Sequence, residues 1–457
     1  MSTITALGRR RRNHELGLGV HAIAIVVGAY ILLALASGPN LPPETPIILA
    51  ATAGLYLVAH LALRRFAPNA DGTIIPVVAT LNGLGFVAIS RLVRDSDIKS
   101  VHHLATVQAT WTALGVAIFV ATLAIVREPR MLVRYRYTSA FVGGVLLLLP
   151  LVPHPIGETI NGARIWAKLG PISFQPGELA KVLLVIFFAG YLVDRRELLA
   201  EGTRKFGPIR VPAFRHLAPL LAVWALSILV LVAEQDLGSS LLLFSVFVAM
   251  LFVATNRPIY LAGSAVLFGA GALFAYKLVS HVRVRVDTWI DPWHQAQTGG
   301  YQIIQSWYAF AAGGLSGRGL GLGSPDKVPV AVSDFILAAI GEELGLLGTI
   351  AVVLLFLLLV GAGFRAAIDH PDPFAKLLAT GLTVIIGVQA FVIIGGVTRL
   401  IPLTGVTLPF VSYGGSSLLG NFILIALLAR VSDGASLAPQ QQQPAVPVRV
   451  AAWDGVS

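Results

Sequence analysis

Long apolar stretches, separated by short polar segments, form the main pattern along the chain. A helix needs about 20 apolar residues to cross a bilayer, because the hydrocarbon offers no hydrogen-bond partner to free backbone groups. About twelve stretches approach this length. The pattern therefore predicts an all-α polytopic membrane helix bundle, whose spans we place at residues 18–37, 45–63, 73–92, 107–126, 138–153, 178–193, 217–233, 237–255, 258–279, 334–363, 375–398 and 405–430.

Composition excludes most other classes of protein. Of the 457 residues, 56% are hydrophobic and 12% are charged, about half of the roughly 25% charge usual in soluble domains. Soluble globular, disordered, collagen-like and disulfide-stapled proteins are therefore excluded. Because the sequence contains 0 cysteines, thiolate nucleophiles and Cys-ligated metals are excluded as well.

Basic residues predict which way the bundle faces. Arg9 to Arg12 precede the first span, and alternation of the spans places the other arginine-rich loops on the same side. Since cytoplasmic loops are enriched in Lys and Arg, we predict cytoplasmic N- and C-termini, with 1–17 as a basic N-terminal segment and 432–457 as a disordered tail. The net charge of +10 indicates contact with anionic membrane lipids and no nucleic acid, because the sequence has no basic soluble face interleaved with aromatics.

A loop of roughly 50 residues, 280–330, lies on the predicted extracytoplasmic side. Loops of that length are usually functional or disordered. Its aromatic side chains, among them Trp289 and Trp293, favour interfacial helices, since amphipathic rings settle at the membrane surface. Arg283 and Arg285 open the loop against the positive-inside bias, which indicates either phosphate or headgroup binding or simple loop solubility.

Ionisable residues at helix ends or within spans are costly and are therefore candidates for function. Glu178 and Lys181 share one helical face, so they either neutralise each other or contact substrate. Asp236 either caps the following helix or acts in a site.

Three carboxylates lie at the start of the tenth span. Glu342 and Glu343 are adjacent and would raise each other's pKa, so they and Asp334 are candidates for acid or base chemistry. The alternative is helix capping together with ion pairs to Arg399 or Lys327.

Two glycine-rich runs remain. The run 313–323 does not follow a strand of a βαβ unit, so close backbone approach or a backbone anion site is favoured over nucleotide binding. The run 404–417, which contains Ser416, is typical of tight helix crossings and a polar cavity wall.

Together these segments resemble the SEDS family (shape, elongation, division and sporulation), the polytopic glycosyltransferases that include RodA and FtsW. The resemblance extends in the family's order over a core at 73–431, and the two additional spans within 18–72 resemble the actinobacterial RodA branch. The matching segments are 161–166, 175–181, 236–238, 300–306, 313–323, 333–335, 342–345, 401–405 and 412–417.

The resemblance implies a plasma-membrane enzyme that polymerises lipid II into peptidoglycan strands during cell elongation or shape maintenance. The 4-hydroxyl of one lipid-linked GlcNAc attacks the anomeric carbon of MurNAc on the growing undecaprenyl-diphosphate-linked glycan, and configuration inverts. This reaction needs a carboxylate for the hydroxyl proton and cations for the departing diphosphate. A class B penicillin-binding transpeptidase is the implied partner, no cofactor is evident, and a divalent cation is left open. The candidate substrate contacts are Arg164, Arg283, Arg285, Gln302, Lys327 and Arg399.

One departure concerns the residue that the family uses as its essential carboxylate. The family's loop reads Asn/Asp-Pro-x-x-Asp-Pro-x-Gly-x-Gly-Tyr, and counting back from Tyr301 puts Gln295 where the second Asp stands. An amide cannot accept a proton at neutral pH. Asp291, one helical turn earlier, is our candidate base, and His294 is a second candidate. The remaining alternative is a non-catalytic protein that binds or translocates lipid II or scaffolds its transpeptidase.

Overall fold

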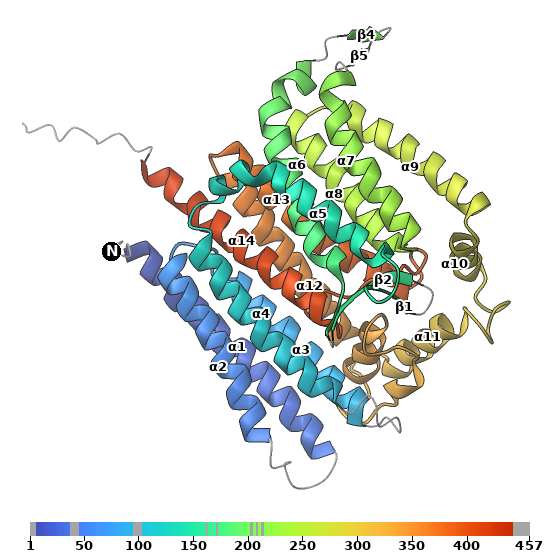
Figure 1. Ribbon diagram of the computed structural model, residues 1–457. Helices are drawn as coiled ribbons and strands as arrows, with labels where there is room; N and C mark the ends of the chain where they lie inside the picture. The colour runs from blue at the N-terminus through green and yellow to red at the C-terminus, as the bar shows by residue number, and fades with distance from the viewer. Residues whose placement is uncertain are drawn as a thin grey trace, which may run out of the picture.

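Long helices run side by side through most of the computed structural model (Figure 1), which describes residues 6–36, 45–94, 103–160, 163–170, 172–201, 204–206, 209–211 and 214–441. Within these residues, eleven helices are long and apolar enough to cross a membrane, and α7 adds a shorter apolar stretch, Ala218–Val230. The predicted all-α membrane bundle is therefore confirmed. Its α-helices are α1 (Ala6–Ala36), α2 (Thr45–Phe66), α3 (Ile74–Arg94), α4 (Leu104–Ile125), α5 (Arg136–Leu148), α6 (Pro176–Glu201), α7 (Phe214–Ala233), α8 (Leu237–Thr255), α9 (Pro258–Leu278), α10 (Ser280–Ile290), α11 (Tyr301–Gly313), α12 (Ile336–Asp369), α13 (Pro373–Val397) and α14 (Gly415–Gln441).

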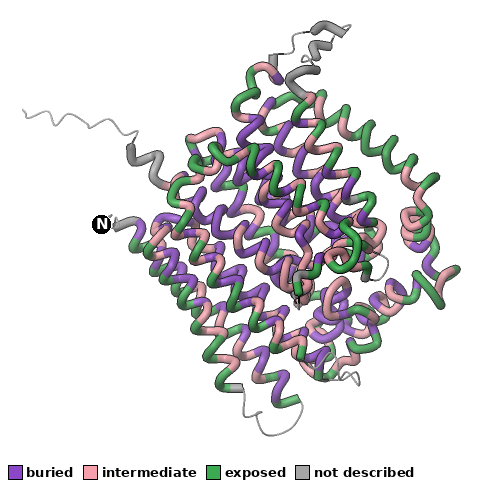
Figure 2. The backbone as a smooth tube through the Cα atoms, viewed as in Figure 1, coloured by how far each residue is buried: buried purple, intermediate pink, exposed green. Residues whose placement is uncertain are grey.

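Four helices, α3, α6, α13 and α14, form the centre of the bundle. Between 72% and 78% of the residues in their apolar stretches are buried, and Figure 2 shows buried residues concentrated along the middle of the bundle. Small residues allow this packing: a Cβ on Gly381 of α13 would lie 2.6 Å from Val185 on α6 and from Met250 on α8. Helix α9, in contrast, runs along the edge with none of its apolar stretch buried (Figures 1 and 2).

Several predicted boundaries are wrong. Helix α1 begins at Ala6, well before 18. Its first turns contain charged residues, which the apolar pattern did not count as part of a span, and the burial of Arg12 there is compensated by its ion pair with Glu15. Helix α14 begins at Gly415 and not at 405, because Gly405 and Phe410 adopt left-handed backbone conformations with φ of 77° and 65°. It continues to Gln441, so the first ten residues of the predicted tail are helical, and the rest of that tail lies outside the described residues.

Short strands at the ends of the bundle were not predicted. The strands β1 (Gly157–Ile160), β2 (Ala163–Leu169) and β3 (Ile172–Phe174) form an antiparallel sheet between α5 and α6. Gly170, with φ of 63°, takes the left-handed conformation that the tight turn between β2 and β3 needs. A second hairpin, β4 (Arg204–Phe206) and β5 (Ile209–Val211), connects α6 to α7 at the opposite end of the bundle (Figure 1).

The two ends of the bundle differ in what they carry. The start of α1 and the end of α14 meet at one end, where Arg11 donates a hydrogen bond to Ser436; we call this the proximal end and the opposite one the distal end. The loop 280–330 lies at the distal end (Figure 1) and contains the helices α10 and α11, so helices are present in it as predicted.

Helix α12 is broken at Gly345, whose φ and ψ are 67° and −166°. The glycine-rich run 313–323 wraps around the break: the amide of Arg318 donates to the carbonyl of Glu342 at 3.0 Å, and that of Gly319 donates to Glu343 at 2.9 Å. A Cβ on Gly317 would lie 2.1 Å from the Glu343 carbonyl oxygen, so only glycine fits there. The close backbone approach predicted for this run is confirmed.

Candidate active site

Arg285 and Asp334 approach the same point at the distal end from α10 and from the start of α12. The Arg285 Nη1 donates to the carbonyl of Leu403 at 3.1 Å. A Cβ on Gly405 would lie 3.4 Å from Arg285 Nη2 and 3.7 Å from Asp334 Oδ2. Burial raises the pKa of the Asp334 carboxyl to about 6, although the Ser333 hydroxyl and Arg285 act to lower it. Asp334 is therefore suited to exchange a proton near neutral pH.

Two more carboxylates lie in the turn between α7 and α8. Asp236 Oδ1 accepts a hydrogen bond from the amide of Ser239 at 2.9 Å, so the predicted cap of α8 is confirmed, and Asp236 also acts electrostatically on Arg285. Glu234 is buried, and its Oε1 has no hydrogen-bond partner among the described residues. Burial and the neighbouring Asp236 raise the pKa of Glu234 to about 8. We call Arg285, Asp334, Asp236 and Glu234 the Arg285 cluster.

Arg283 lies apart from this cluster. Its guanidinium donates to the carbonyls of Tyr276 and Lys277 at 3.3 and 2.6 Å, and stacks over the Tyr276 ring at 6.0 Å. It therefore satisfies the C-terminal carbonyls of α9. The structure does not bring Arg283 and Arg285 together as one phosphate-binding fork.

The candidate base Asp291 is exposed in the turn after α10. Its Oδ1 accepts hydrogen bonds from the amides of Trp293 and His294 at 3.1 and 3.2 Å, and its Oδ2 makes no hydrogen bond within the described part of the chain. The His294 side chain is also exposed. Gln295 is held inside the turn, where its Oε1 accepts a hydrogen bond from the Thr288 hydroxyl at 2.7 Å.

Arg399 connects the segment 398–414 to the end of α10. Its Nε donates to the Trp289 carbonyl at 2.7 Å, the Trp289 indole donates to the Arg399 carbonyl at 3.0 Å, and the guanidinium lies 5.1 Å from the centre of the Trp307 ring. Arg399 thus fixes the orientation of α10 and, through it, of Arg285.

The ion pairs predicted for Glu342 and Glu343 are wrong. Glu343 accepts a hydrogen bond from Arg91 of α3 at 2.7 Å, and both side chains are 4% exposed. Glu342 Oε1 accepts from the amide of Ser324 at 2.8 Å and lies 3.8 Å from Arg318. Neither glutamate pairs with Arg399 or Lys327, because the glycine-rich run brings Arg318 to them and α3 brings Arg91.

The remaining predicted substrate contacts are dispersed. Lys327 is exposed and lines a cavity of about 150 Å³ together with Tyr308, Arg318 and Glu342. Gln302 is half-buried on α11, and Arg164 is exposed on β2, where its backbone amide donates to the Glu234 carbonyl at 3.1 Å.

Glu178 and Lys181 pair at 2.9 Å, as predicted. The pair extends into a polar network: Lys181 donates to Gln389 of α13 at 3.4 Å, and Gln389 donates to the Thr407 carbonyl at 2.9 Å. At the same end of α6, the amide of Gln175 donates to the Ser416 hydroxyl at 2.9 Å. The network stabilises the irregular segment 398–414 beside the Arg285 cluster.

No group of three or more His, Cys, Asp or Glu side chains with metal-binding geometry occurs among the residues that the structure describes.

Most of the chain is similar to a known protein family. The model of the FtsW, RodA and SpoVE family, described as cell cycle protein, matches residues 72–436. The chain belongs to this family. Peptidoglycan glycosyltransferase RodA of Mycobacterium tuberculosis is 46% identical over 428 residues, which cover 93% of this chain and 91% of that protein.

Solved structures of the FtsW, RodA and SpoVE family have the same fold. A chain of a peptidoglycan synthase complex, whose title concerns the coordination of polymerization and crosslinking, matches with a TM-score of 0.66 at 26% identity and covers 80% of this chain and 98% of that one. The Rod shape determining protein RodA of Thermus thermophilus matches with a TM-score of 0.54 at 25% identity, covering 82% and 98% of the two chains.

Two polar residues of this family member were not among the predicted site residues. Arg91 stands at the distal end of α3, the end that also carries Arg283 and Arg285 and that the sequence predicts to face outward. Glu234 precedes Asp236 in the short turn between two apolar spans, and its burial explains its raised pKa. The position of Arg91 was the signal that the sequence offered.

Proposed function

We propose that this protein is a peptidoglycan glycosyltransferase that polymerises lipid II into glycan strands. The observation that carries the proposal is the similarity to mycobacterial RodA, a protein named peptidoglycan glycosyltransferase, over nearly the entire chain. The Arg285 cluster supports it, because a half-buried guanidinium beside the expected membrane surface suits a diphosphate.

The proposed reaction transfers the growing glycan from one carrier to the next. The 4-hydroxyl oxygen of the lipid-linked GlcNAc forms a bond to the anomeric carbon of MurNAc, while the bond from that carbon to the diphosphate oxygen breaks. Asp291 takes the hydroxyl proton through its unoccupied Oδ2, and undecaprenyl diphosphate leaves with the bonding electrons. Arg285 stabilises the charge that develops on the leaving group.

The same proposal includes a place in the cell and a partner. The arginine-rich proximal end faces the cytoplasm and the distal end faces outward in the plasma membrane, as the positive-inside rule favours. A class B penicillin-binding transpeptidase would bind alongside, in keeping with the similarity to a chain of a peptidoglycan synthase complex.

A second candidate function rests on Gln295. Its amide replaces the carboxylate of the family pattern and is bonded to Thr288, so this chain would bind or translocate lipid II, or scaffold the transpeptidase, without catalysis. Under this alternative the Arg285 cluster holds the diphosphate but no base activates the hydroxyl.

The test is polymerisation of purified lipid II by the full chain together with its transpeptidase, with glycan strands separated on gels. We expect polymer from the wild type, loss of polymer in Asp291→Asn, and a rate lower by about a hundredfold in Arg285→Gln, since removing one stabilising donor costs that much. Arg283→Gln and Asp326→Asn are matched controls that remove an exposed charge at the same end.

The outcomes separate the two functions. Absence of polymer from the wild type, with polymer gained in Gln295→Asp, would establish the non-catalytic alternative. If both the wild type and Asp291→Asn form polymer, Asp291 is not the base, although the protein is a glycosyltransferase.

A further inference from the structure

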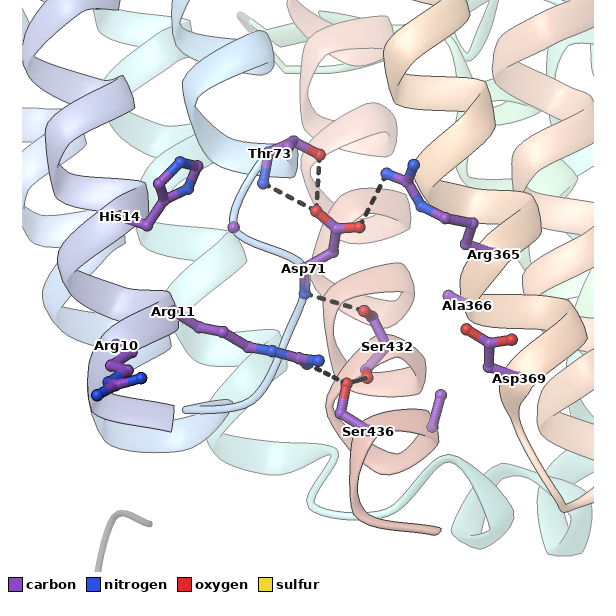
Figure 3. Close-up of a pocket in the computed structure, with 12 residues that line it drawn as sticks. Arg10, Arg11, His14, Asp71, Thr73, Arg365, Ala366, Asp369, Ser432 and Ser436 are labelled. Atoms are coloured by element: carbon purple, nitrogen blue, oxygen red, sulfur yellow. Dashed lines mark hydrogen bonds and ion pairs between the residues drawn. The ribbon is translucent and has the colours of Figure 1, made fainter. Parts of the chain in front are cut away.

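A cavity of about 490 Å³ opens at the proximal end, far from the Arg285 cluster. Figure 3 shows that it lies between α1, the segment connecting α2 to α3, α12 and α14. Its volume is in the range of small-molecule sites. None of its lining residues belongs to the Arg285 cluster.

The two sides of this proximal cavity carry opposite charges. Arg10, Arg11 and His14 line it from α1, and Asp369 lines it from α12 on the other side (Figure 3). Arg365 is already paired with Asp71 at 3.1 Å. Arg10 and Asp369 are exposed, and neither makes a hydrogen bond or ion pair to the rest of the described chain.

Asp71 is fully engaged within the protein. Its Oδ1 accepts from the amide and hydroxyl of Thr73 at 2.9 and 2.7 Å, and its Oδ2 accepts from Arg365. Arg11 likewise donates to the Asn69 carbonyl at 2.8 Å and to Ser436, with part of its fork left over. The groups left for a ligand are therefore cationic on the α1 side and anionic at Asp369.

Beyond the cavity, helix α12 presents exposed apolar side chains toward the middle of the bundle. On α12, Leu354 and Leu358 are 53% and 52% exposed, and their spacing from Arg365 puts them on the same helical face. Between them and Arg365 stands Gly361, where an added Cβ would meet no atom within 4 Å. A hydrocarbon chain can lie along this face while a polar headgroup occupies the cavity.

We propose that the proximal cavity binds a zwitterionic phospholipid whose headgroup carries a primary ammonium, with phosphatidylethanolamine as the simplest case. Arg10 and the free part of the Arg11 fork bind the phosphate, and Asp369 accepts hydrogen bonds from the ammonium. One acyl chain lies over Gly361 against Leu358. A choline headgroup has no N–H to donate to Asp369.

Retention of lipids on the purified full-length protein tests this assignment. The protein is equilibrated with mixed vesicles containing equal amounts of phosphatidylethanolamine, phosphatidylcholine and phosphatidylglycerol, extracted, and analysed by native mass spectrometry. We expect the ethanolamine lipid to be retained about fivefold over the choline lipid, the ratio that one solvent-exposed hydrogen bond worth about 1 kcal/mol supplies.

Two variants test the binding of the ammonium and of the phosphate separately. Asp369→Asn should abolish the preference for ethanolamine over choline, while Arg10→Gln should lower retention of all three lipids about fivefold. Asp326→Asn and Arg9→Gln are the controls, because each removes the same charge outside the cavity. All four side chains are exposed, so folding is preserved.

Equal retention of ethanolamine and choline lipids by the wild type would overturn the proposal, and so would an Asp369→Asn variant that behaves like Asp326→Asn. A last arm uses soluble phosphoethanolamine. If it raises the unfolding temperature as much as the lipid does, the ligand is a soluble phosphate compound and the assignment to a lipid is wrong.

Discussion

Arg285 and Asp334 lie on either side of Gly405 at the distal end of the bundle, each within 4 Å of the position that a Cβ on this glycine would occupy. The cation comes from α10 and the carboxylate from the start of α12, and Arg285 is anchored to the carbonyl of Leu403. The arrangement joins the guanidinium that we propose binds the diphosphate to a carboxyl whose pKa is about 6. It also requires glycine at 405, where φ is 77°.

The first prediction concerns the pH dependence of glycan polymerisation. If ionised Asp334 is needed, kcat/KM rises with pH through about 6, the pKa of its carboxyl. Arg285→Gln removes a cation that lowers this pKa, so the rise should move to higher pH. Arg283→Gln should leave it in place, because Arg283 is bound to the end of α9. A pH profile that shifts equally in both variants would contradict the relationship.

The second prediction concerns the buried pair of Arg91 and Glu343. Arg91→Gln should lower the free energy of unfolding by about 3–5 kcal/mol, because it leaves a buried carboxylate without its counter-charge. Unfolding in mixed detergent micelles measures this. Asp194→Asn breaks the half-exposed pair with Arg136 and should cost less than about 1 kcal/mol. Similar losses in the two variants would show that Glu343 is compensated by other groups.

The third prediction concerns the break in α12. In Gly345→Ala, the new Cβ would lie 2.3 Å from the amide nitrogen of Gly317, at a residue with φ of 67°. We expect destabilisation by about 2 kcal/mol or more, from backbone strain and the collision together. Gly361→Ala, in the regular part of the same helix, has open space around it and should not destabilise the protein. The thermal unfolding temperatures of the two variants provide the comparison.

The fourth prediction concerns Glu234 and stability. Burial raises its pKa from 4.5 to about 8 in the folded protein, so its favourable contribution is complete below about pH 4.5 and is lost as pH rises through about 8. The unfolding temperature should fall between pH 5 and pH 9 less steeply in Glu234→Gln than in the wild type. Glu197→Gln, an exposed change at the proximal end, should retain the wild-type slope.

The apolar pattern predicted the spans because burial in lipid or protein requires runs of apolar residues whatever their neighbours are. It failed at 405–414, where Pro409 and the left-handed residues Gly405 and Phe410 interrupt an apolar run without making it more polar. The short strands escaped prediction for a related reason: their pairing depends on partners brought together by the helices, and their sequences have no strong alternation of their own.

Of the distal residues described above, Arg285, Asp236 and Asp334 were named from the sequence, but Glu234, Arg91 and most of the pairings were not. Arg91 and Glu343 are 252 positions apart, and no local rule indicates that they meet. The separation of the Arg283 and Arg285 side chains could have been predicted from the sequence, since residues two apart on a helix point in nearly opposite directions. The engagement of Gln295 by Thr288 is a contact across a turn that the loop sequence did not indicate.

The bracing of α12 by the glycine-rich run affects how this protein can be recombined with its relatives. Backbone hydrogen bonds join Gly314 to Leu346 and Leu315 to Leu347, across the break at Gly345. A chimera that exchanges the loop 280–330 alone would take the two residues that accept these hydrogen bonds from one protein and the two that donate them from another. Exchange of 313–347 as one segment keeps these backbone hydrogen bonds together, and Arg91 of α3 has to be kept with it as the partner of Glu343.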